Sequence, residues 1–511
     1  EKMRLFDDNN NIGIVSKMNL YCDNCHTDTV FHTSNSNNKV FEANMRLCYA
    51  MRCIGVGREG THLFCGVMNM PPPSSRFSYL NNHLINSLEV ECKKSMCDAA
   101  TEVVSLKKEI EAAVTEANTS TREFSNLADS PNTDLAVSCD GTWMKRGHTS
   151  LHGVASIVSI DTGKVIDLQV MSKYCSVCAL RKKSADEEEE KKWQEEHKMS
   201  CARNYCGSSG GMEAAAMKLM FHRSEALYGV RYTQYLGDGD SSSFKSVVES
   251  APYGPDCKLE KLECVGHIQK RMGGRLLKLK REMRGKKLED GKTLGGAGRL
   301  TDKEIHNIQI YYGMAIRKNV GDLKGMQHAV WATYFHKLST DANPSHELCN
   351  VSWCKYLKAK QEKKPYTHTH SLPLAVMNVI KPTFKFLANP ELLKKCTHGK
   401  TQNPNESCHN LIWKRCPKTS FASSTIVKIA SFDAALVFNS GNISRVRVLE
   451  RLGFSSGAYT LKILKTIDDN RIAASENSSS TMEKEARQRN QVKRKAVQEA
   501  EQDDEYGYGL H

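Results

Sequence analysis

Three carboxylates from distant parts of the chain, Asp140, Asp238 and Glu406, could together hold divalent metal ions. Cleavage of a phosphodiester bond commonly uses two such ions, because they stabilise both the attacking and the leaving oxygen of an in-line displacement. Magnesium and manganese prefer the hard oxygen ligands that carboxylates supply. The three residues therefore predict a Mg²⁺ or Mn²⁺ site for phosphodiester chemistry.

Each carboxylate also has a purely structural explanation. Asp140 and Asp238 both precede a glycine, which is typical of turns. Asn403 could cap a helix and place Glu406 at the third helical position, where a glutamate completes a capping box. Asp240 could replace Asp238 as the working residue, although the intervening glycine favours Asp238.

The elements that would position these side chains follow from the spacing of apolar residues. From Asp134 onward apolar and polar residues alternate, which predicts a strand with Asp140 at its end. The next predicted elements are strands at residues 151–160 and 164–171, a helix at 212–227, and strands at 231–236 and 262–265. A three-stranded meander followed by a helix and a strand, with acidic residues at two strand ends, is the order of an RNase H-like α/β domain.

The chain divides further by composition. The predicted parts are a small Cys-rich module that zinc could support (1–73), a helical linker (74–130), the first part of the RNase H-like core (131–300) with a zinc-binding insertion (172–210), a large mostly helical insertion (301–395), the last part of the core with the Glu406 helix (396–475), and a charged tail (476–511). The core is expected to be a mixed sheet with flanking helices.

The insertion at 172–210 contains the strongest metal-binding pattern. Cys175 and Cys178 have the spacing that lets two thiolates bind one ion, and His197 and Cys201 follow about 18 residues later. Cys206 could replace one of the four. We expect a structural Zn²⁺ here, the alternative being free reduced cysteines, because the charged insertion has little core of its own.

A second cluster, His346, Cys349 and Cys354, lacks an obvious fourth ligand. His336 or Cys396 could complete it.

The charge of the chain points to a polyanionic partner. There are 72 Lys and Arg against 58 Asp and Glu, a formal net charge of +14, and nucleic acid is the first such partner to consider. A helix predicted over residues 268–287 carries nine basic residues and one acidic one, which favours contact with phosphates over a helix facing the acidic tail. The residues expected to contact DNA are Lys270, Arg271, Arg275, Lys278, Lys280 and Arg281.

Five runs of sequence occur in an order that resembles the Mutator-like transposase domain, a branch of the DDE transposases. They are CDGTWMKRG from Cys139, NYCGSSGGME from Asn204, YLGDGDSSSF from Tyr235, ECVGHIQKRMG from Glu263 and TQNPNESCHNLIWKRCPK from Thr401, within a similarity that spans roughly residues 44–454. The resemblance implies a catalytic triad, which by motif falls on Asp140, Asp238 and Glu406. It also places the Cys-x-x-His motif of these transposases on Cys264 and His267, which could bind zinc or brace the active site.

The resulting expectation is a metal-dependent DNA transposase that nicks transposon ends and then lets the freed 3′-hydroxyl attack target DNA. The alternatives are a domesticated DNA-binding protein that retains the fold without catalysis, and an RNase H-like nuclease that cuts without joining strands. The expected partners are transposon-end and target DNA, while a homo-oligomer is left open.

The location of the protein follows from the same reasoning. No apolar stretch approaches the roughly 18 residues of a membrane span, and the charged first residues do not suit a signal peptide. A soluble intracellular protein in the nucleus is expected, with Lys493-Arg494-Lys495 as a candidate import signal. Since the sequence starts without Met, a DNA-binding domain could precede it.

Overall fold

The computed structural model describes residues 3–8, 10–118, 133–145, 149–181, 186–198, 200–238, 242–419 and 421–479. The chain forms two compact units: the first combines Glu1–Cys92 with Phe432–His511, and the second is Lys93–Ser431. None of the described helices combines the length and the apolar character needed to cross a membrane.

The first unit joins elements from both ends of the chain. Its N-terminal elements are the antiparallel strands β1 (Met3–Asp7), β2 (Lys17–Cys22) and β3 (Asp28–His32), the short strands β4 (Ser36–Asn37) and β5 (Val40–Phe41), the helices α1 (Glu42–Cys53) and α2 (Arg58–Val67), and the start of α3 (Phe77–Asn118). Its C-terminal elements are the end of α15 (Ser424–Ser440), η2 (Asn442–Ser444), α16 (Arg445–Arg451) and α17 (Ala458–Ser479).

A buried polar cluster connects these two sets of elements. The Tyr49 hydroxyl of α1 donates to Oδ1 of Asp433 at 2.7 Å, and the Arg445 guanidinium donates to Oδ2 of Asp433 at 2.7 Å. Asp433 is 1% exposed, so its charge must be compensated inside the protein. Burial and the neighbouring Asp433 raise the pKa of Tyr49 well above its ordinary value, which keeps the hydroxyl protonated as a donor.

The second unit is built on a five-stranded mixed sheet. Its strands are β6 (Asp134–Trp143), β7 (His152–Ser159), β8 (Val165–Ser172), β9 (Arg231–Gly237) and β10 (Glu260–Glu263), in the spatial order β10-β9-β6-β7-β8. The meander β6-β7-β8 is antiparallel, whereas β6, β9 and β10 are parallel. The expected mixed α/β class is confirmed. The prediction that β6 ends at Asp140 is wrong, because β6 pairs with β7 as far as Trp143.

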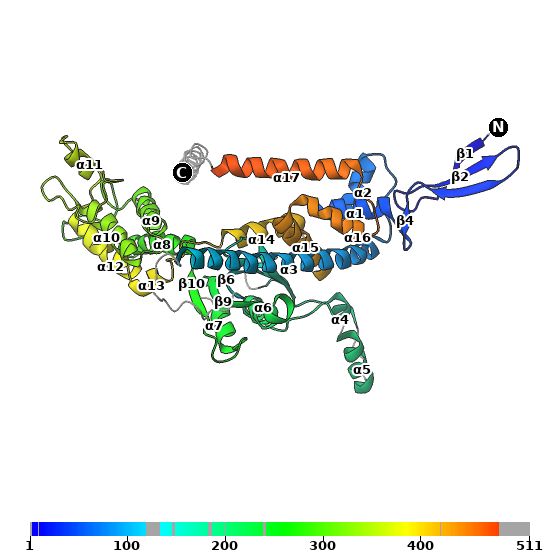
Figure 1. Ribbon diagram of the computed structural model, residues 1–511, viewed down its shortest axis with the longest axis horizontal. Helices are drawn as coiled ribbons and strands as arrows, with labels where there is room; N and C mark the ends of the chain where they lie inside the picture. Colours follow the sequence, from blue (N-terminus) through cyan, green and yellow to red (C-terminus); the bar gives the residue numbers. More distant parts are fainter. Residues whose placement is uncertain are drawn as a thin grey trace, which may run out of the picture. The chain divides into compact units, whose positions relative to one another are not determined.

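Helices cover this sheet because one face of its strands is apolar. In β6 the alternating residues Leu135, Val137 and Cys139 are buried and belong to one core cluster with Met217 and Phe221 of α6 (Met212–Tyr228). The helix α7 (Ser242–Glu249) follows β9, and α6 and α7 are drawn beside the sheet (Figure 1). Between β8 and α6 the chain forms α4 (Ser176–Leu180), α5 (Glu187–Lys198) and η1 (Ser209–Gly211).

The remainder of the second unit is mostly helical. Its helices are α8 (Val265–Glu282), α9 (Asp302–Arg317), α10 (Leu323–Leu338), α11 (Lys355–Gln361), α12 (Leu374–Leu387), α13 (Pro390–Lys394) and α14 (Asn403–Arg415). Residues of α8, α9, α10, α12 and α13 share a second core cluster, and these helices gather together in Figure 1. The predicted basic helix is shorter than expected, since α8 ends at Glu282 and Gly285 has a φ of +78°.

Candidate active site and metal centre

The first two proposed carboxylates lie at the same level of neighbouring strands. β6 and β9 are parallel and pair Ser138 with Leu236, so Asp140 and Asp238 each lie two residues further along. Neighbouring strands are about 4.8 Å apart, and side chains two residues from paired positions share the face of those paired positions. The Asp140 side chain is 29% exposed and that of Asp238 68% exposed, so both reach solvent at this end of the sheet.

His267 of α8 connects the second and third proposed carboxylates. Its Nδ1 forms an ion pair with Oδ1 of Asp238, and its Nε2 lies 3.8 Å from Oε1 of Glu406. The hydrogen bond with His267 holds the pKa of Asp238 below its ordinary value, and the same bond raises the pKa of His267. Asp238 and Glu406, which are 168 positions apart in the sequence, therefore lie within reach of one imidazole ring.

A second histidine contacts Asp140, although the sequence did not single it out. Nδ1 of His409 on α14 lies 3.4 Å from Oδ2 of Asp140, and its Nε2 lies 2.8 Å from the Ser156 hydroxyl of β7. His409 follows Glu406 by three residues, which places both on one face of α14. The sequence signal was this i, i+3 spacing in the run that begins at Thr401.

Polar side chains at the start of α14 attach this helix to the strand that carries Asp140. Nε2 of Gln402 donates to the Cys139 carbonyl at 2.8 Å, and Nδ2 of Asn405 donates to the carbonyls of Ser138 and Ser156 at 3.1 Å. Gln402 and Asn405 are buried. These bonds explain why a glutamate so late in the sequence returns to the sheet.

The capping-box explanation for Glu406 is wrong. Gln402, and not Asn403, precedes the first helical residue, and no side chain caps this end of the helix. Glu406 is therefore the fourth residue of α14, and the caps are absent because Gln402 and Asn405 bond to β6 and β7 instead. The Glu406 carboxylate is 55% exposed and points toward His267. The turn explanation for Asp140 also fails, since that residue lies inside β6.

Glu213, at the start of α6, is a fourth carboxylate that the sequence analysis did not identify. It accepts a hydrogen bond from the Ser243 hydroxyl at 2.9 Å and packs against the backbone of Gly141. Burial, together with the charges of Asp140 and Asp238, raises the pKa of Glu213 to about 7. Its sequence signal was weak, because a glutamate in the first turn of a helix is ordinary.

Asp140, Asp238 and Glu406 present hard oxygen ligands that reach solvent, and the chemistry of this donor set suits a divalent cation. The three are not among the groups of described side chains whose ligand atoms all lie within 4.8 Å of one another. Burial is the main cause of the raised pKa of Glu213, and the charges of Asp140 and Asp238 act in the same direction. Asp240, the alternative to Asp238, lies outside the described residues.

Cys264 braces the site from the end of β10. Its Sγ accepts a hydrogen bond from the backbone N–H of Gln402 at 3.4 Å, and it is buried. The Cys/His/Asp/Glu groups of metal-binding geometry among the described residues do not include Cys264 or His267. Of the two roles that the motif left open, zinc binding and bracing, the contacts of Cys264 and His267 with protein groups support bracing.

The six basic residues of α8 have different surroundings. Arg271 pairs with Glu263 at 3.4 Å and Lys280 with Asp302 at 2.8 Å, while the Arg275 guanidinium lies 3.8 Å from the centre of the Phe386 ring. Lys278 pairs with Glu282 on its own helix at 3.7 Å, and for Arg281 the structure records no ion pair with a described residue. The charges of Lys270 and Arg271 both act on Asp238, and that of Lys270 also acts on His267. These two cations of α8 are therefore linked electrostatically to the candidate site.

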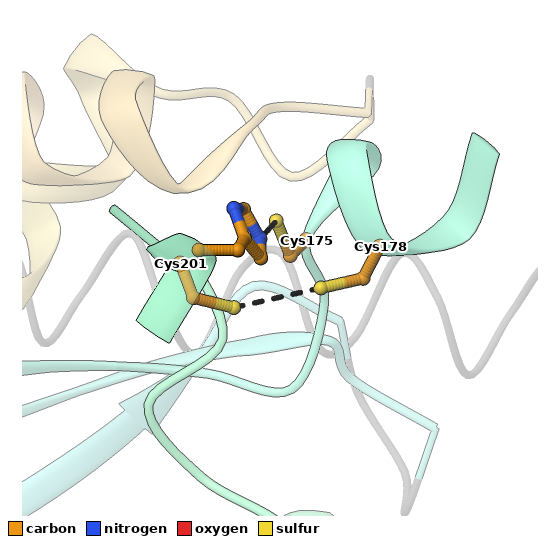
Figure 2. Close-up of side chains that lie close together, drawn as sticks. Cys175, Cys178 and Cys201 are labelled. Atoms are coloured by element: carbon orange, nitrogen blue, oxygen red, sulfur yellow. Dashed lines mark hydrogen bonds between the residues drawn. The ribbon is translucent and has the colours of Figure 1, made fainter. Parts of the chain in front are cut away.

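The four predicted zinc ligands in the insertion come together. Ligand atoms of Cys175, Cys178, His197 and Cys201 all lie within 4.8 Å of one another. Cys175 and Cys178 come from the start of α4 and Cys201 from the segment that follows α5, and the sulfurs of Cys178 and Cys201 are 3.6 Å apart (Figure 2). Nε2 of His197 lies 3.4 Å from Sγ of Cys175. A tetrahedral zinc ion requires S–S distances of about 3.8 Å and S–N distances of about 3.6 Å.

The surroundings of this cluster also suit a metal. Burial alone would raise the pKa of Cys175, but hydrogen bonds from the backbone of Cys178 and Ala202 outweigh it and lower the pKa to about 6. A thiolate is the form that binds metal. Nδ1 of His197 lies 3.2 Å from the Ser200 hydroxyl, which leaves Nε2 to act as a ligand. Cys206 is exposed and is not part of the cluster.

The cysteines of the N-terminal module contact protein groups instead. Sγ of Cys25 lies 2.8 Å from the Thr27 hydroxyl, and Sγ of Cys48 donates to Oδ1 of Asn81 at 3.5 Å. Within residues 3–8 and 10–73, no group of three metal-ligating side chains comes together.

Comparison with known proteins places the chain in one family. A family model described as Mutator-like transposase matches residues 2–354. The match includes Asp140, Asp238, Cys264 and His267, and it ends before Glu406. No curated protein and no solved structure gives a significant match.

Proposed function

Because the chain belongs to the Mutator-like transposase family, we propose that it is a DDE-type DNA transposase with an RNase H-like catalytic core. In this proposal Asp140, Asp238 and Glu406 form the catalytic triad, cleave DNA at transposon ends and support transfer of the freed strand to target DNA. The family implies DNA as the partner, and a net charge of +14 agrees with it.

The observation that supports the proposal is that α14 brings Glu406 within 3.8 Å of the histidine paired with Asp238, and brings His409 within 3.4 Å of Asp140. Asp140 and Asp238 extend from matched positions of neighbouring parallel strands, and Glu406 shares the imidazole of His267 with Asp238. The strand order β10-β9-β6-β7-β8, with an antiparallel meander followed by two parallel strands, supports the RNase H-like assignment.

Asp140, Asp238 and Glu406 would hold Mg²⁺ or Mn²⁺, which when bound stabilises the charge on the attacking and leaving oxygens. The histidines keep two of these carboxylates in place: His267 orients Asp238, and His409 orients Asp140. Lys270 would attract the DNA phosphates toward the site without reading sequence. The nucleophile is water or a DNA hydroxyl, so no nucleophilic side chain is required.

Cys175, Cys178, His197 and Cys201 would bind a structural Zn²⁺ that folds the insertion between β8 and α6. The insertion needs such support because α4 has no buried residues and the described side chains of α5 are exposed or half-buried. A transposase acts on chromosomal DNA, so the nucleus is its proposed location. The candidate import signal Lys493-Arg494-Lys495 lies outside the described residues.

The proposal is tested with the full chain, DNA carrying the ends of its own element, and Mg²⁺ or Mn²⁺. We expect Asp140→Asn, Asp238→Asn and Glu406→Gln each to reduce strand cleavage by more than the roughly 10–100-fold that loss of an outer-shell partner costs. Asp161→Asn is the matched control, because Asp161 is an exposed carboxylate in the turn between β7 and β8. DNA binding by all four variants should stay close to that of the unmodified chain.

Two outcomes would reject the enzyme. If the unmodified chain binds its element's ends but never cuts them, the domesticated DNA-binding alternative replaces it, although the family match does not favour that alternative. If Glu406→Gln cuts as fast as the unmodified chain, the triad is wrong. Cutting without joining in a strand-transfer assay would instead identify a simple nuclease.

A further inference from the structure

A second group of metal-ligating side chains lies in the helical part of the second unit. In the sequence it falls between Asp238 and Glu406 and includes neither of them. His336 is in the last turn of α10, His346 and Cys349 lie in the connection that follows, and Cys354 immediately precedes α11. Their ligand atoms all lie within 4.8 Å of one another. The structure thus supplies His336 as the fourth member, whereas the buried Sγ of Cys396 donates to the Leu392 carbonyl.

We propose that His336, His346, Cys349 and Cys354 bind a second structural zinc ion, through Nδ1 of each histidine and Sγ of each cysteine. The distances match such an ion. A tetrahedral zinc with two nitrogens and two sulfurs requires an N–N distance of about 3.4 Å and N–S distances of about 3.6 Å. The two Nδ1 atoms are 3.2 Å apart, and the four N–S distances are 3.5, 3.5, 3.7 and 3.9 Å.

The outer surroundings of His346 prepare it as a ligand. Nδ1 of His368 lies 2.6 Å from the carboxylate of Asp341, and its Nε2 lies 2.9 Å from Nε2 of His346. When Nδ1 of His368 donates to Asp341, its Nε2 accepts from Nε2–H of His346, which leaves the lone pair of His346 Nδ1 for the metal. A carboxylate and a histidine arranged behind a metal ligand in this way fix its tautomer and its orientation.

The position of the cluster also suits a structural ion. His346 and Cys354 are buried, and His336 and Cys349 are half-buried. All four ligands would come from the protein, which is typical of a structural zinc site.

The ion would replace a hydrophobic core that this connection lacks. Leu348, Val351 and Trp353 are 36%, 44% and 39% exposed, so the apolar residues of the connection are not packed away from solvent. Zinc would join the connection to the end of α10 and to the start of α11. His336 and Cys349 also line a cavity of about 720 Å³, so loss of the ion should reshape that wall.

The test measures the zinc content of the full chain, purified without chelator, by mass spectrometry of the metal. The unmodified chain should contain two zinc ions, since the insertion cluster provides the other. Cys349→Ser and Cys178→Ser should each contain one, and the double variant none. Cys396→Ser is the matched control, because Cys396 is a buried cysteine in the same helical region outside the cluster, and this variant should keep two.

X-ray absorption on Cys178→Ser examines the second site with its own ligands intact, so the result does not depend on the folding of Cys349→Ser. We expect about two sulfurs near 2.3 Å and two nitrogens near 2.0–2.1 Å around the remaining ion. A Cys178→Ser chain without zinc, or a folded Cys349→Ser chain with two ions, would overturn the proposal. A Cys178→Ser chain that keeps both ions would instead reject the insertion site and leave this one standing.

Discussion

Each proposed catalytic aspartate has a histidine partner that comes from a different element. Asp238 is held by His267 of α8, and Asp140 by His409 of α14. A carboxylate that binds a metal loses less conformational freedom on binding when a neighbouring group already fixes its orientation. The hydrogen bond with Asp238 also raises the pKa of His267, which favours a positive charge beside Asp238 and Glu406.

Replacing His409 by alanine should slow DNA cleavage by about 10–100-fold, the usual cost of losing an outer-shell partner of a metal ligand. The reason is that Asp140 would lose the ring that now lies 3.4 Å from its Oδ2. His409→Asn should recover part of the rate, because its side-chain amide can donate from a position close to that of Nδ1. Single-turnover cleavage and DNA affinity are the measurements.

The control for His409→Ala is His222→Ala, since His222 is exposed on α6 and lies away from the pairs described above. Equal rates for His409→Ala and His222→Ala would show that His409 does not position the site. A merely structural role predicts that His409→Ala and His409→Asn lower the melting temperature without a selective loss of cleavage.

At the scale of elements, the site depends on how the start of α14 is attached to the sheet. Gln402 and Asn405 donate to backbone carbonyls of β6 and β7, and Nε1 of Trp413 donates to the Thr142 hydroxyl of β6 at 2.9 Å. Ordinary helix capping is absent from the first turn. The polar side chains of this turn therefore attach the helix to the sheet and position Glu406, instead of capping the N-terminus of the helix.

Asn405→Ala should reduce the free energy of unfolding by about 1–3 kcal/mol, because it removes the side-chain donor to two buried carbonyls. It should reduce cleavage further than the stability change explains, since Glu406 is on the same turn. Chemical denaturation and cleavage assays are to be compared with Asn410→Ala, an exposed asparagine of the same helix. Indistinguishable behaviour of the two variants would contradict this role for the first turn.

At the scale of the whole molecule, the first and last described parts of the chain form one unit. The residues before Cys92 and after Phe432 share the buried Tyr49, Asp433 and Arg445 cluster. Glu91 adds a second link, because its carboxylate lies 2.6 Å from Nε of Arg451. The second unit, by contrast, is continuous in sequence from Lys93 to Ser431 and contains all three proposed catalytic residues.

Asp433→Asn should reduce the free energy of unfolding of the first unit by about 3–5 kcal/mol, the usual cost of breaking a buried ion pair by removing one partner. The Arg445 side chain is 11% exposed, so its charge would remain poorly solvated. Asp469→Asn, at an exposed position of α17, is the control and should change stability by less than about 0.5 kcal/mol. A stable Asp433→Asn chain in denaturant titrations would show that the cluster does not join the two parts.

The sequence alone determined the local features of this protein. Alternating apolar residues predicted the strand that carries Asp140, and cysteine spacing predicted the insertion cluster, because both signals act over short separations. Local spacing could not show that Gln402 and Asn405 bond to β6 instead of capping, that the charges of Asp140 and Asp238 act on Glu213, or that His336 completes the second cluster. These relations depend on contacts between residues far apart in the chain, which only the tertiary structure brings together.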